Sequence, residues 1–292
     1  MRSFSKIYLL LVILIVPSIL TCTKNPVGVV QYNWYPLAVG NSWEYSRIQA
    51  FVNLESDTIC PFPGPETLFS TASVQVIKKD TLLDSIPAFQ LYKTIQDPSF
   101  SFTAVTYFNN LEDGLYFYAY NWPIVIPPLQ ISSAKSLYFK GRHFADPREL
   151  FLWLEAGKFP SSLTPDSLTY YLPPRKSIQY PLRVNSQWTY TQEGDPWRTD
   201  KKIVGFGLLT TPAGNFNCYK IQWLYDLDDD GEWDTDIEFF EFLSEIGIVK
   251  WSILVKDLII TDYCFGHPAT VDILEETQLT SYVSSLPSLP IK

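Results

Sequence analysis

Short runs of alternating apolar and polar residues occur along the chain, and residues that favour turns separate them. Alternation with a period of two, bounded by Pro and Gly, is typical of half-buried antiparallel strands. In the second half of the chain this pattern predicts strands over residues 188–191, 201–209, 216–224, 237–243, 248–255, 258–265 and 273–283. Long amphipathic helices do not alternate with these runs, which argues against a parallel α/β fold. We therefore expect a mainly β protein of antiparallel strands, arranged as a curved sheet or half-barrel, or as a sandwich.

Three segments recur in the same order in the two halves of the chain. A Tyr-Pro-Leu segment with a later Trp and Tyr begins at Tyr35 and again at Tyr180. The other similar pairs are residues 86–93 with 212–220 and residues 112–116 with 245–249. Repetition in the same order indicates a duplicated unit or one sheet built twice, although aromatic strands can also be similar by chance. The matches predict two related β halves, residues 32–126 and 182–285.

A Pro-rich bridge over residues 127–181 connects these expected halves. In residues 146–149 of this bridge, Asp can cap a helix, Pro suits the first helical position and Glu completes a capping box. The apolar run that follows ends at Gly157, a natural helix stop. We expect one short helix here, in a bridge that is either a covering flap or an interdomain connection. Residues 286–292 are expected to form a C-terminal tail.

The N-terminal segment has the composition of an export signal. Arg2 and Lys6 precede or flank an unbroken apolar run over residues 7–16, which ends before Pro17. A membrane-spanning helix needs about 20 apolar residues, so this run is too short to span a bilayer. The residues that follow it are also not those expected beside a membrane-spanning helix. We therefore expect residues 1–21 to be a signal peptide.

The end of this segment, residues 19–22, resembles the lipobox of bacterial lipoproteins. The resemblance implies cleavage before Cys22, a lipid on that cysteine as the membrane attachment, and a tether over residues 22–31. Thr21 departs from the Gly, Ala or Ser that is usual at its position. Thr23, where Asp would retain a lipoprotein at the inner membrane, implies delivery to the outer membrane. An ordinary secretory signal and an uncleaved anchor, with Cys22 incidental, are the alternatives.

Composition and charge narrow the classes of function. Hydrophobic residues make up 46 % of the 292 residues and aromatic residues 16 %, so the chain has ample apolar surface to bury in a core. The formal net charge of −9 leaves no basic surplus for nucleic-acid phosphates. We therefore exclude a disordered protein and a nucleic-acid-binding protein.

An Asp-rich segment between two expected strands has the spacing of half a calcium loop. Asp226, Asp228 and Asp230 stand at positions 1, 3 and 5, and a Gly follows them. Calcium takes about six to eight oxygen ligands, which these residues, the backbone carbonyl of Glu232 and the carboxylate of Asp234 could largely supply. The flanking strands and the apolar position 12 depart from an EF-hand. The segment predicts a weak structural calcium site, with a solvated hairpin tip as the alternative.

The cysteines beyond the lipobox permit one intramolecular disulfide. They are Cys60, Cys218 and Cys264, an odd number with no Cys/His metal spacing. We expect Cys218 to pair with Cys264, because both lie in strands of the second half. The alternative is that all three are small buried hydrophobic residues.

Catalytic signatures are weak in this chain. The two histidines, His143 and His267, stand outside any metal motif, and no GxSxG nucleophile elbow is present. The adjacent Glu275 and Glu276 would point to opposite faces of a strand and could not act as a pair. We expect no enzymatic activity, and a hydrolase with an unrecognised site is the alternative.

Three motifs resemble those of a loose set of exported bacterial proteins and lipoproteins. They are YPLxxGxxWxY at Tyr35–Tyr45, PAGxFxxYK at Pro212–Lys220 and GIVK at Gly247–Lys250. That set is distantly similar to the curved β half-barrels of periplasmic lipoprotein carriers. The resemblance implies a fold and brings no catalytic residues with it.

Aromatic residues on the expected strands are the first candidates for ligand binding. The six to examine are Trp43, Tyr45, Trp188, Tyr190, Trp223 and Trp251. They would line a groove for an apolar ligand or, more ordinarily, form the core. Lys201 and Lys202 are expected to lie on a solvated strand edge. The sequence thus predicts a non-enzymatic cell-envelope module that binds a ligand or an envelope protein, with a carrier or sensor of a hydrophobic ligand in a concave sheet as the alternative.

Overall fold

A computed structural model describes residues 34–55, 67–97, 100–121, 137–156, 168–191, 194–264 and 267–285. Tyr32–Lys292 form one compact unit, separate from Met1–Gln31. The expected signal peptide, the lipidation site Cys22, the tether and the tail at residues 286–292 lie outside the described residues. The described part is mainly β, as the alternation pattern predicted.

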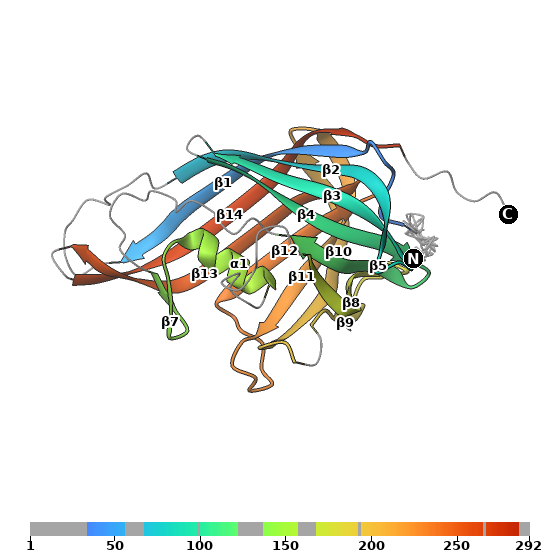
Figure 1. The fold of residues 1–292 in the computed structure, drawn as a ribbon. Coiled ribbons are helices and arrows are strands. Elements are labelled where there is room, and N and C mark those ends of the chain that lie inside the picture. Colours follow the sequence, from blue (N-terminus) through green and yellow to red (C-terminus); the bar gives the residue numbers. More distant parts are fainter. Residues whose placement is uncertain are drawn as a thin grey trace, which may run out of the picture. The chain divides into compact units, whose positions relative to one another are not determined.

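Twelve antiparallel strands follow one another around a single curved sheet that nearly closes on itself (Figure 1). Their order is β8-β5-β4-β3-β2-β1-β14-β13-β12-β11-β10-β9. The strands are β1 (Ser42–Glu55), β2 (Thr67–Leu82), β3 (Ile86–Asp97), β4 (Phe100–Leu111), β5 (Gly114–Asn121), β8 (Thr169–Gln179), β9 (Gln187–Thr189), β10 (Arg198–Thr211), β11 (Gly214–Asp226), β12 (Ile237–Ser244), β13 (Gly247–Cys264) and β14 (His267–Val283). Of the architectures that the pattern allowed, the curved sheet is the one formed.

The sheet consists of two consecutive six-strand meanders, β1-β2-β3-β4-β5-β8 and β9-β10-β11-β12-β13-β14, joined by the β1–β14 pair. In the first meander, residues 40–41 form two backbone hydrogen bonds with Val76, and in the second, residues 185–186 form the same two with Ile203. A register shift follows Val76 in β2 and Ile203 in β10. The segments that precede the first strand of each meander, both with a Tyr-Pro-Leu sequence, therefore meet the sheet in the same way.

The Tyr-Lys pair that ends the second repeated segment does not occupy equivalent positions in the two meanders. The residue opposite the shifted position is Leu91 in β3 and Ile221 in β11. Lys93 lies two residues after Leu91, and Trp223 lies two residues after Ile221. Lys93 and Trp223 therefore occupy equivalent positions in the two meanders. The sequence match of these segments is out of register because the arms of the two hairpins differ in length: Leu91 follows the first residue of β3, Ile86, by five positions, whereas Ile221 follows the first residue of β11, Gly214, by seven.

The first and last strands of the sheet approach each other through side chains. Trp188, on β9, donates from Nε1 to the carbonyl of Lys176 on β8, at 3.0 Å. Arg175 of β8 forms an ion pair with Asp195, at 2.6 Å between Nη2 and Oδ1. Both groups of this ion pair are largely buried. The two ends of the sheet are therefore joined by polar contacts that are shielded from solvent.

The α-helix of the described residues is α1 (Pro147–Ala156), where the capping pattern predicted it. Asp146 accepts the N–H of Glu149 through Oδ1 at 3.1 Å, and the Glu149 carboxylate accepts the N–H of Ala145. This reciprocal arrangement satisfies backbone donors that a helix start leaves free. A hairpin of β6 (Leu137–Phe139) and β7 (Arg142–Phe144) precedes the helix and pairs with β13. In the described part, no helix has the length and apolar content needed to cross a bilayer.

Inward side chains pack into two main hydrophobic clusters. One contains Trp43, which is fully buried and donates from Nε1 to the carbonyl of Ile246. The other contains Leu150, Trp153 and Leu154 of α1 together with residues of β13 and β14. The helix in the bridge therefore contributes to the core, which agrees with a covering flap more than with a connection.

The expected disulfide between Cys218 and Cys264 is not formed. Cys218 is a buried free thiol on β11, and its Sγ donates to the carbonyl of Phe216 at 3.4 Å. Its neighbour Tyr219 pairs with Leu243 of β12, which in turn pairs with Ile248 at the start of β13. Cys218 is therefore level with the start of β13, whereas Cys264 is the last residue of that strand. At about 3.3 Å per residue the two cysteines are on the order of 50 Å apart, well beyond disulfide reach.

Candidate ligand-binding site

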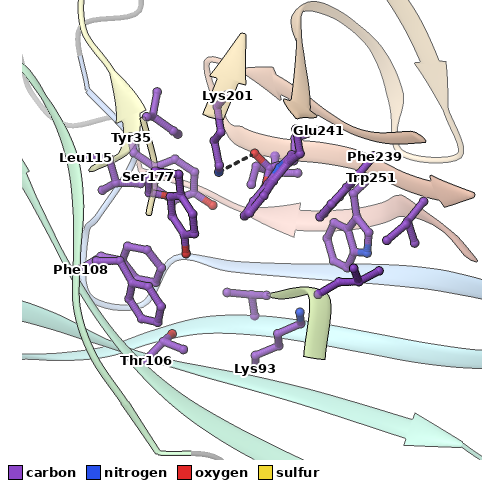
Figure 2. Close-up of a pocket in the computed structure, with 18 of the residues that line it drawn as sticks. Tyr35, Lys93, Thr106, Phe108, Leu115, Ser177, Lys201, Phe239, Glu241 and Trp251 are labelled. Atoms are coloured by element: carbon purple, nitrogen blue, oxygen red, sulfur yellow. Dashed lines mark hydrogen bonds and ion pairs between the residues drawn. The ribbon is translucent and has the colours of Figure 1, made fainter. Parts of the chain in front are cut away.

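A cavity of about 210 Å³ lies on the inner face of the curved sheet, and Figure 2 shows its walls. Its lining comes from eleven of the twelve strands of the sheet, from Tyr190 directly after β9, and from Phe151 and Leu154 of α1. A single structural water needs only about 10–15 Å³. The cavity is therefore large enough for an organic group and lies partly under the helix of the bridge.

Most of the cavity wall is aromatic or aliphatic. Trp223 and Phe239 stack with their ring centroids 4.8 Å apart and their planes 8° apart. Tyr45 packs against Trp251 at 4.9 Å. Such offset ring pairs stabilise the wall beyond the burial of their area, so these rings form a rigid apolar surface.

The six aromatic residues singled out from the sequence all belong to the hydrophobic clusters or pack against them. Four of them, Tyr45, Tyr190, Trp223 and Trp251, also line the cavity. The other two, Trp43 and Trp188, are buried and do not reach it. The hydroxyl of Tyr45 donates to the carbonyl of Ile248 at 2.9 Å. Burial raises the pKa of Tyr45 well above its ordinary value, so this hydroxyl stays neutral at physiological pH.

Lys201 is a buried charge of the cavity wall and not the solvated edge residue that the sequence predicted. Its side chain is 1 % exposed, and Nζ lies 3.1 Å from Oε2 of Glu241. The same ammonium lies 3.7 Å from the centroid of the Trp223 ring, a favourable cation–π distance. The prediction was wrong because Lys201 is in phase with the inward residues of β10, between Thr199 and Ile203.

A second ion pair lies on the wall formed by β1 and β14. Arg47 donates through Nε and Nη2 to both carboxylate oxygens of Glu275, at 2.9 and 2.6 Å. Glu275 lines the cavity, while the adjacent Glu276 pairs with Lys250 at 2.7 Å. The two glutamates thus have different partners, as expected of neighbours on one strand.

Lys93 reaches the cavity from β3, and Figure 2 shows it across the pocket from the Lys201–Glu241 pair. Its Nζ lies 5.3 Å from the centroid of the Trp251 ring. Among the described residues Lys93 has no hydrogen-bond or ion-pair partner. Nε1 of Trp223 is also buried without a hydrogen-bond partner in this part of the chain. Because that nitrogen is covered by protein, Lys93 is the one of these two groups that is open to an occupant of the cavity.

The Asp-rich segment begins at the end of β11 and forms the loop to β12, and none of its aspartates lines the cavity. Asp226, Asp228 and Asp230 place one carboxylate oxygen each within 4.8 Å of one another and could hold a metal ion. The carboxylate of Asp226 accepts the N–H groups of Asp230 and Gly231, both at 3.1 Å. These bonds curl the loop around its first aspartate.

The other two residues of the predicted calcium site lie outside this carboxylate group. Asp234 accepts the N–H of Leu227 at 2.8 Å and pairs with Lys140 at 2.5 Å. Three of the four predicted carboxylate ligands therefore come together. The ligand expected from Glu232 is its backbone carbonyl, which the grouping of carboxylates does not test. The ammonium group of Lys140 neutralises part of the loop's negative charge.

No protein-family model and no curated protein matches the chain. Among solved structures, the chain is similar to a "putative lipoprotein" from Parabacteroides distasonis, with 14 % identity, a TM-score of 0.36, and coverage of 87 % of this chain and 98 % of that one. It is also similar to a "putative exported protein with YmcC-like fold" from Bacteroides fragilis, with 12 % identity, a TM-score of 0.35, and coverage of 86 % and 99 %. A fold by itself does not define a function, so function has to be argued from the site.

Sequence reasoning missed the charged residues of the cavity, although a signal for them exists. Glu275 stands in phase with Ile273 and Leu279 on β14, and Glu241 stands in phase with Phe239 and Leu243 on β12. A charge at an apolar phase of a strand indicates a polar group that points into the core. This phase, more than motif matching, would have located the site.

Proposed function

We propose that the protein is a non-enzymatic, lipid-anchored binding protein of the bacterial cell envelope that encloses a hydrophobic ligand on the inner face of its curved sheet. The cavity of about 210 Å³ with mainly aromatic and aliphatic walls carries this proposal. Concave, mostly apolar pockets with a few placed polar groups are the usual sites of small ligands. The proposal favours a carrier or sensor over a purely structural module.

Binding accounts for the charged groups of the cavity better than catalysis does. Glu241 and Glu275 are each engaged by a cation, Lys201 or Arg47. Because each carboxylate already accepts hydrogen bonds from a protein cation, neither is left free to take a proton from a substrate as a general base. Turnover of ester, amide or glycoside substrates would support the hydrolase alternative instead.

The binding proposal is tested by native mass spectrometry of the chain from residue 23 onward. Because Tyr32–Lys292 form a compact unit, this chain contains the complete sheet. We expect protein purified without detergent from the producing bacterium to retain an apolar molecule, which organic extraction releases and identifies. Detection of the unliganded mass only would argue for a structural module.

The lipid anchor is tested at Cys22. We expect Cys22→Ala to abolish metabolic labelling by a fatty-acid analogue, because this residue is the sole acceptor that the lipobox resemblance implies. The matched variant Cys60→Ala should label like the unchanged protein. Labelling that persists in Cys22→Ala would refute the anchor without affecting the binding proposal.

We also propose a structural calcium ion at the loop of Asp226, Asp228 and Asp230, because their carboxylate oxygens converge. For a dissociation constant of about 1 mM, typical of weak extracellular modules, calcium at about 10 mM should stabilise the fold by about 1.4 kcal/mol. Thermal unfolding would register this as a higher Tm.

The calcium effect should depend on the loop. We expect the double variant Asp228→Asn with Asp230→Asn to lose the Tm increase, while Asp84→Asn, at an exposed turn, should keep it. An equal Tm increase in both variants would show that calcium acts through general charge screening. If calcium does not raise the Tm of the unchanged protein, the loop is a solvated hairpin tip and not a calcium site.

A further inference from the structure

The charged side chains that line the cavity do not all have a partner. Four charged side chains reach its surface: Lys93, Lys201, Glu241 and Glu275. Glu241 is engaged by Lys201, and Glu275 by Arg47 behind it. Lys93 alone of the four has no hydrogen-bond or ion-pair partner among the described residues. The cavity therefore presents one ammonium group, that of Lys93, which no described residue pairs with.

We propose that the ligand is a single-chain amphiphile with an anionic headgroup, of which a fatty-acid carboxylate is the simplest, and that Lys93 pairs with this headgroup. This inference rests on the proposed binding function and names the ligand class of the same site. A partly buried ammonium is costly without an opposite charge, and a ligand carboxylate would supply one. The aromatic and aliphatic walls would enclose the hydrocarbon chain.

The size of the cavity favours one short chain over a phospholipid. Pockets for drug-sized ligands span about 300–1,000 Å³, and this cavity, at about 210 Å³, is smaller. A single chain would place one headgroup beside Lys93 and leave the remaining, mainly apolar wall to its hydrocarbon.

The aromatic walls do not favour a cationic ligand, although tryptophan faces commonly bind ammonium groups. Lys201 already lies 3.7 Å from the Trp223 ring centroid, and Lys93 lies 5.3 Å from that of Trp251. Both rings are therefore covered by the protein's own ammonium groups. A ligand cation would have to displace one of them and would meet its repulsion.

The test compares three ligands with equal chains: decanoate, decanol and decylamine. Each is titrated below its micellar concentration into the chain from residue 23, delipidated beforehand, with binding followed by calorimetry. We expect decanoate to bind most tightly and decylamine least. Lys93→Met should weaken decanoate by about 10-fold, the loss of one charge-assisted contact, and should change decanol by less than about 2-fold.

Two further variants separate the headgroup contact from general effects. Lys78→Met removes an exposed lysine that pairs with Asp80 and should leave all three affinities unchanged. Lys93→Glu should reverse the order, so that decylamine binds better than decanoate. Circular dichroism and Tm verify that each variant is folded, and if one Lys93 variant fails to fold, the other decides.

The outcomes distinguish this inference from the proposed function. One contrary outcome is that decanol binds as tightly as decanoate; another is that decanoate keeps its affinity in a folded Lys93 variant. In either case the anionic headgroup is wrong and the hydrophobic binding function stands. If none of the three ligands binds the unchanged protein, this ligand class is overturned, and absence of a retained native ligand would then remove the proposed function as well.

Discussion

Arg47→Met is expected to lower the free energy of unfolding by about 3–5 kcal/mol. The side chains of Arg47 and Glu275 are 7 % and 11 % exposed, and two hydrogen bonds join them. Removing the guanidinium leaves the Glu275 carboxylate inside the sheet without its counter-ion, and the desolvation of that charge is then uncompensated. Urea unfolding followed by tryptophan fluorescence measures the change.

A double variant and a matched pair test the reason for this loss. Because two apolar side chains can replace a buried ion pair at little cost, Arg47→Met with Glu275→Met should recover most of the stability. Lys250→Met breaks the more exposed pair with Glu276 and should cost at most about 1 kcal/mol. A double variant as unstable as Arg47→Met alone would show that the guanidinium acts through other contacts, such as Ser70 Oγ.

Trp43→Ala is expected to cost about 3–5 kcal/mol of unfolding free energy. Trp43 is fully buried in the first hydrophobic cluster, and its indole N–H satisfies the carbonyl of Ile246. The substitution removes the packing of a large ring and also leaves that buried carbonyl without its donor. Chemical denaturation at equilibrium gives the value directly.

The control for this substitution is Trp34→Ala, at a neighbouring tryptophan that is 42 % exposed. Surface substitutions of this kind usually change stability by less than about 0.5 kcal/mol. A comparable loss in both variants would contradict the placement of Trp43 in the core and with it the register of β1.

The alternation of apolar residues was sufficient to predict the strand class and much of the second meander. Residues 237–243 were expected as a strand and form β12 with one more residue, and the capping pattern placed α1 correctly. β13 was expected as two strands, at 248–255 and 258–265. It is one strand with a register shift between Val255 and Leu258, where Asp257 has a φ of 58°.

The closing strand of the first meander was not predictable from local sequence. β8 lies inside the Pro-rich bridge and contains a Pro-Pro pair, which normally argues against a strand. It is tolerated because β8 is at the end of the sheet order and pairs on one side only, with β5. Only the tertiary structure shows which strand is an edge.

The site itself depends on distances between strands that a sequence does not contain. Lys93 and Trp251 are far apart along the chain and on different meanders, yet they meet at the cavity. The repeated segments align Lys93 with Lys220, although Trp223 holds the equivalent position in the sheet, because the arms of the two hairpins differ in length. Phase within a strand was available as a signal, whereas contacts across the inner face were not.

A substitution that fills the cavity is the sharpest test of ligand enclosure. Leu91 lines the cavity, whereas its neighbour Tyr92 is 39 % exposed. Native mass spectrometry should therefore show that Leu91→Trp loses the retained ligand while Tyr92→Trp keeps it, with both variants folded by circular dichroism. Equal retention of the ligand by the two variants would place it outside the cavity and contradict the account.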